Sequence, residues 1–166
     1  MALSDEHAGR AVRTGSGEQA QRSAAAGRRL VVAGWVFGAA TLLHVADHLR
    51  RGQGSITEPL YWAGNFALIL QVALVTLIVT RHRVAPLAAV AIGFPLAIGF
   101  FAAHWLPEWS ALSDPVLQVA DAPALSVVAS ALEVLAAAAV GFAGLAVLRI
   151  GGLASAVGRS VPPRPI

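Results

Sequence analysis

The 166-residue chain contains no cysteine and no lysine, and only 13% of its residues are charged. The lack of cysteine excludes disulfide bonds, thiolate metal ligands and cysteine nucleophiles. With 57% hydrophobic residues and a mean hydropathy of +0.68, the composition excludes a soluble globular domain. The sequence also lacks a G-x-S-x-G elbow, a glycine-rich phosphate loop and the H-E-x-x-H motif of zinc proteases. No sequence motif therefore assigns the chain to an enzyme class.

The chain does contain four long apolar segments, each close to the length of about 20 residues that a membrane-spanning helix needs. The loops between them are short, which predicts an all-α fold, a four-helix transmembrane bundle with up-down-up-down topology. Residues 1–29 are polar and poor in aromatics, and they are expected to form a disordered N-terminal tail. Residues 150–166 are expected to form a flexible C-terminal tail. Within the transmembrane domain, 30–149, the predicted spans are about 30–49, 60–80, 84–106 and 124–148.

The arginines predict the orientation of the bundle. Ten of the 12 basic residues lie in the two tails, in the turn between spans two and three, and at Arg149 after span four, whereas Arg50 and Arg51 lie on the other side. The positive-inside rule then places both termini in the cytoplasm of a multi-pass protein in the bacterial cytoplasmic (inner) membrane. Because arginines beside apolar spans act as topology determinants, the predicted partner is the lipid bilayer and not nucleic acid.

Ionisable residues gather at the outer end of the first span, where they are costly and usually functional. His44 and His48 are four residues apart and share one helix face. Counting about 1.5 Å per residue from the cytoplasmic arginines puts His44, Asn65 and Glu133 about 22–24 Å up the bundle. The same count puts His48 and His104 about 28–31 Å up. The polar groups of three spans are thus expected in the outer half of the bilayer.

This convergence predicts a metal or cofactor site. The expected metal ligands are His44, His48, His104 and Glu133, with Asp47, Asn65 and Asp121 behind them or lining the pocket. Without sulfur ligands, zinc, iron, copper(II) and manganese are the candidate divalent ions. An alternative cofactor is haem b, held by His48 and His104 as axial ligands. The catalytic residues, and whether the protein is an enzyme, stay open.

Two other functions stay open beside metal binding. In the first alternative the chain is an accessory or assembly subunit of a larger membrane complex, and the small residues Gly34 and Gly38 pack against a partner. The polar residues then form a structural interhelical network. In the second alternative the chain is a small oligomeric transporter. Glu133 then carries protons or substrate, and Pro95 kinks the third span.

Two motifs carry a resemblance that covers residues 30–150. They are His44-x-x-Asp47-His48-Leu49-Arg50 and His104-x-x-Pro107-x-Trp109-Ser110-x-x-Ser113-Asp114. In these motifs the chain resembles a set of small uncharacterised four-span bacterial integral membrane proteins. The resemblance implies the four-span architecture and no activity.

Overall fold

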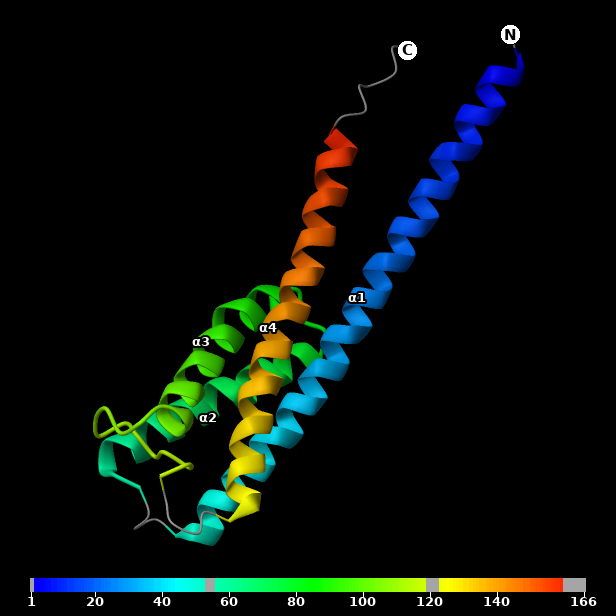
Figure 1. Cartoon of the computed structure of the whole chain (residues 1–166). Helices are drawn as coiled ribbons and strands as arrows, with labels where there is room; N and C mark the ends of the chain where they lie inside the picture. The colour runs from blue at the N-terminus through cyan, green and yellow to red at the C-terminus, as the bar shows by residue number, and fades with distance from the viewer. Residues whose placement is uncertain (1, 53–55, 119–122, 160–166) are drawn as a thin grey trace.

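The protein folds as four helices whose directions alternate along the chain (Figure 1). The computed structural model describes residues 2–52, 56–118 and 123–159, with side chains described for 17–52, 56–118 and 123–152. No strand occurs in these ranges, and each helix is long and apolar enough to cross a membrane. The predicted all-α four-helix bundle is therefore confirmed. The helices are α1 (Ala2–Arg51), α2 (Glu58–Val79), α3 (Ala85–Trp105) and α4 (Ala124–Arg159).

The helices at the two ends of the chain are longer than the predicted spans. α1 begins at Ala2 and α4 continues to Arg159, so helix replaces the irregular tails expected over most of 1–29 and over 150–159. Extending an existing helix needs no new nucleation, and these segments are rich in helix formers such as alanine. Both ends project beyond the bundle on the same side (Figure 1).

A cap, a tight turn and an internal proline characterise α2 and α3. Thr57 caps the start of α2, where its hydroxyl oxygen accepts a hydrogen bond from the Leu60 amide at 3.4 Å. α2 and α3 are joined by a tight turn in which Arg81 has a φ of 54°. α3 remains one helix through Pro95. Both ends of α2 and α3 lie within two residues of the predicted spans 60–80 and 84–106. α4 begins where the fourth span, 124–148, is predicted to begin.

Small residues bring the helices close together. A Cβ atom on Gly93 of α3 would lie 2.9 Å from the Ala137 carbonyl oxygen of α4, and one on Gly34 of α1 would lie 2.6 Å from Ile78 of α2. Gly34 and Gly38 thus pack inside this chain against α2, so their faces are not free for an external partner. The apolar core includes Phe37, Leu74, Ile78, Ala137 and Val140.

α2 separates from the rest of the bundle at its N-terminal end. Its buried residues are Gln71, Leu74 and Ile78, all in the C-terminal half of the helix. Large apolar side chains such as Phe66 and Ile98 are exposed on the outside of the bundle, as expected of lipid-facing positions. The end of the bundle where α1 and α3 finish and α4 begins holds the buried polar residues described next.

Candidate metal centre

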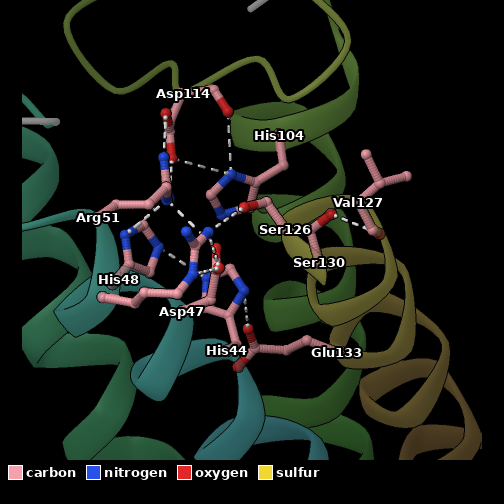
Figure 2. Close-up of polar contacts among 11 residues, drawn as sticks. His44, Asp47, His48, Arg51, His104, Asp114, Ser126, Val127, Ser130 and Glu133 are labelled. Atoms are coloured by element: carbon pink, nitrogen blue, oxygen red, sulfur yellow. Dashed lines mark hydrogen bonds and ion pairs between the residues drawn. The ribbon is translucent and has the colours of Figure 1, made fainter. Parts of the chain in front are cut away.

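Three histidines meet at this end of the bundle, and we refer to His44, His48 and His104 as the three-histidine cluster (Figure 2). One nitrogen of each ring lies within 4.8 Å of the corresponding atoms of the other two. The ring centroids are 4.5 Å apart for His44–His48, 4.9 Å for His44–His104 and 5.9 Å for His48–His104. His44 is 8% exposed and His104 is 3% exposed, so two of the rings are buried.

The local structure explains why these rings converge. The spacing of four residues stacks His44 and His48 on one face of α1, and His104 lies in the last turn of α3. After α3 the chain folds back on itself, since the Asp114 amide donates to the Ala103 carbonyl at 2.8 Å and the Val116 amide to the His104 carbonyl at 3.0 Å. His104 Nδ1 in turn donates to the Asp114 carbonyl oxygen at 3.1 Å, which leaves Nε2 without a proton.

The hydrogen bonds of His44 and His48 fix their tautomers when both rings are neutral. Arg51 Nη2 lies 2.9 Å from His48 Nδ1, and a guanidinium can only donate, so the proton of His48 is on Nε2. That nitrogen is 2.9 Å from His44 Nε2, which accepts. The proton of His44 is therefore on Nδ1, which faces Glu133 Oε2 at 3.3 Å. Arg51, His48 and His44 thus form a directed chain of hydrogen bonds, and the carboxylate of Glu133 faces its last ring.

Glu133 lies behind His44 and not beside the nitrogens that face each other. Its side chain is 1% exposed, and the Gln71 side chain of α2 lies near it. Gln71 also accepts a hydrogen bond from the Thr41 hydroxyl. Neither His44 Nδ1 nor Glu133 Oε2 has a well-directed hydrogen bond, although both atoms are buried. A carboxylate in this position is suited to orienting the imidazole of His44.

An arginine–aspartate cluster, made of Asp47, Arg50, Arg51 and Asp114, lies beside the histidines. Figure 2 shows its members Asp47, Arg51 and Asp114. Asp47 is 2.7 Å from Arg50 and 3.2 Å from Arg51, and Arg51 is 2.7 Å from Asp114. Arg50 also donates to the Ser126 hydroxyl of α4 at 3.3 Å. The cluster ties the loop after α3 and the start of α4 to the end of α1, and its charges balance.

A cavity of about 520 Å³ adjoins the three-histidine cluster. Its walls come mainly from α1, from the N-terminal half of α2 and from α3, and most of the lining side chains are apolar. The polar lining residues are His44, His48, Tyr61, Asn65, Gln71, His104 and Glu133, together with Trp109 from the loop.

The remaining predicted site residues lie as follows. Asp47 contacts Arg50 and Arg51, and no contact with a histidine ring is described for it. Asn65 lines the cavity, but its amide nitrogen donates to the Tyr61 carbonyl of its own helix at 2.8 Å. Asp121 lies outside the described residues. Gln71 is the buried α2 group near Glu133, in the place predicted for Asn65.

Arg51 and Asp114 belong to the site but were not among the predicted site residues. Arg51 follows Asp47 by four residues and His48 by three, and this spacing alone predicts contacts on one helix face. Asp114 lies in an irregular loop that packs back on α3, and no periodicity in the sequence predicts its contact with Arg51.

Comparison with known proteins adds no family to these observations. No family model, no curated protein and no solved structure matches the chain. What is known of the molecule is therefore four helices apolar enough to cross a membrane and a buried histidine cluster that could hold a metal ion.

Proposed function

We propose that the protein is a multi-pass membrane protein that binds one divalent transition-metal ion at the three-histidine cluster. The observation that carries this proposal is the placement of three imidazole nitrogens, from α1 and α3, within 4.8 Å of one another inside a membrane bundle. Ionisable groups at such depth are rare and usually functional. Imidazole suits zinc, iron, copper(II) and, less well, manganese, and the chain has no sulfur ligand that would favour copper(I).

The groups behind the histidines support a ligand role. Metal-binding histidines commonly donate their other N–H to a carboxylate or a backbone carbonyl. His44 has Glu133 in this position and His104 has the Asp114 carbonyl oxygen. We therefore assign Glu133 to orienting His44 and the ligand set to the three histidines, which leaves a fourth position toward the cavity.

His48 differs from the other two histidines because a donor, Arg51, faces its Nδ1. Binding of an ion through Nε2 of a neutral His48 requires the proton of that atom to move to Nδ1. Arg51 keeps Asp47 and Asp114 as partners when its contact with His48 opens. Metal uptake is therefore coupled to a small rearrangement of one arginine.

The geometry favours a single ion over haem b. The His44 ring lies 4.5 Å from the His48 ring and 4.9 Å from the His104 ring, so it fills the space between them. A macrocycle held axially by His48 and His104 needs that space.

The packing below the cluster argues against the transporter alternative. Inward of Glu133, the described part of the bundle is filled by apolar side chains such as Phe37, Leu74 and Val140, each 0% exposed. A proton or polar substrate that reached Glu133 would meet no further ionisable group in the spans. The hydrogen bonds from Arg51 through His48 to His44 end inside the bundle, as expected of a binding site.

Elemental analysis of the purified protein tests the proposal. We expect about one equivalent of zinc, iron, copper or manganese per chain, and loss of that metal in the double variant His44→Ala/His48→Ala. His82→Ala is the matched control, because His82 lies in the exposed turn between α2 and α3. Metal that is absent from the wild type after reconstitution, or that survives the double variant, would exclude the proposed site and favour a structural network.

A further inference from the structure

The cavity beside the three-histidine cluster is open between two helices at membrane depth. Its lining includes Gly64 of α2 and Ile98 and Gly99 of α3, and all three are exposed on the outside of the bundle. A Cβ atom on Gly64 or Gly99 would meet nothing within 4 Å. The opening therefore faces the hydrocarbon region that surrounds the helices, and a ligand can enter from the bilayer without crossing water.

The walls of the cavity suit a hydrocarbon chain. Leu60, Leu68, Leu96, Phe100 and Leu112 contribute apolar surface, and the volume of about 520 Å³ is in the range of small-molecule sites. The histidines and Glu133 belong to the same lining, so one ligand can touch both regions. An amphiphile with a single chain matches this division.

The charges of the site indicate the head group. Asp47 and Asp114 balance Arg50 and Arg51. A divalent ion on three neutral imidazoles adds two positive charges, and ionised Glu133 removes one of them. A net charge inside a bundle is costly unless it is paired. A monoanionic head group at the fourth metal position makes the site neutral.

We infer that the cavity binds a long-chain carboxylate, a fatty acid, with its carboxylate on the metal and its chain between α2 and α3. This inference rests on the proposed metal site. Carboxylate oxygens are ordinary ligands of the same ions that imidazole binds. The apolar chain stays in contact with the apolar walls and reaches the lipid between the two helices.

The test uses cobalt(II) as a visible probe in the full chain, purified in a non-ionic detergent. Dodecanoate is added to the cobalt-loaded protein, and the visible absorption spectrum of the ion is followed. We expect a saturable change with one dodecanoate per chain. Dodecan-1-ol, which has the same chain length and no charge, is expected to bind at least tenfold more weakly.

A variant with a blocked opening separates binding in the cavity from binding to the ion alone. Gly99→Leu is expected to keep the cobalt and to bind dodecanoate at least tenfold more weakly. Gly27→Leu is the matched control, because its Cβ is equally unhindered and Gly27 does not line the cavity.

Each result decides between the claims. A spectrum that dodecanoate leaves unchanged, an equal response to dodecan-1-ol, or unchanged dodecanoate binding in Gly99→Leu would overturn the fatty-acid inference while the metal site stands. A wild-type protein that takes up no cobalt, zinc, copper, iron or manganese would overturn the metal site and this inference with it.

Discussion

Each histidine of the cluster has its Nδ1 atom next to a defined neighbour. Glu133 lies next to His44, Arg51 next to His48 and the Asp114 carbonyl oxygen next to His104. Fixing one nitrogen of a ring fixes its tautomer and the direction of the other nitrogen. The function of the cluster therefore depends on residues that do not themselves face the proposed ion.

Replacing Glu133 by glutamine tests this dependence. Glutamine keeps the shape of the side chain but removes the negative charge that faces His44 Nδ1, so metal affinity should fall by about 10–100-fold while the protein still folds. The measurement is a metal titration of the purified variant, with Glu108→Gln, an exposed acid in the loop, as the control. Wild-type affinity in Glu133→Gln would show that the carboxylate has no part in the site.

The arginine–aspartate cluster should stabilise the fold unequally. Arg51→Ala leaves buried Asp114 without its arginine and should cost about 3 kcal/mol of unfolding free energy. Asp114→Ala should cost less, because Arg51 keeps Asp47 at 3.2 Å. Denaturant unfolding in detergent measures both, and the double variant should lose less than the sum of the two. A larger loss in Asp114→Ala than in Arg51→Ala would contradict this description of the cluster.

At the level of the helices, apolar length and spacing predict most of the architecture, whereas the rotation of each helix is harder to predict. Depth counting correctly brought His48 near His104, because both lie one turn or less from helix ends. The same count predicted Asn65 beside His44, but Asn65 bonds to its own helix and Gln71 is the buried group. Height along a helix does not say which face a residue occupies, and α2 diverges from the bundle at the level of Asn65.

The close contact of α3 with α4 yields a matched pair of substitutions. Gly93→Ala should destabilise the protein by about 1–3 kcal/mol, since its Cβ would lie 2.9 Å from a backbone oxygen that cannot move alone. Gly99→Ala in the same helix should be neutral or stabilising by up to about 1 kcal/mol, because it meets nothing within 4 Å and alanine favours helix. Thermal unfolding in detergent compares the two. Equal effects would mean that α3 and α4 are farther apart than described.

For the molecule as a whole, the four apolar helices could be predicted from the sequence, but the way the loop from 106 to 118 packs against α3 could not. This loop supplies Asp114 through hydrogen bonds to the end of α3, and its sequence has neither a helical nor a strand period. Helical spacing and depth thus predict which histidines meet. The neighbours that set the tautomers of these histidines can be identified only in the folded structure.

The lack of cysteine allows a clean test of the orientation proposed from the arginines. Thr80→Cys lies in the turn between α2 and α3, and Leu117→Cys lies in the loop between α3 and α4; both positions are exposed. If both termini are cytoplasmic, a membrane-impermeant maleimide added to intact cells should label the Leu117→Cys protein and not the Thr80→Cys protein. Opening the cells should make both react. Labelling of the Thr80→Cys protein alone in intact cells would show that the orientation is the opposite of the predicted one.

The central claim is that three imidazoles bind one ion, and X-ray absorption spectroscopy of the zinc-loaded protein tests it most directly. We expect imidazole nitrogens at about 2.0–2.1 Å, three per zinc, with one further light-atom ligand. Any zinc retained by His44→Ala/His48→Ala should have at most one imidazole ligand, whereas His82→Ala should keep all three. A zinc site with only oxygen ligands, or with one imidazole, would show that the three histidines do not bind the ion together.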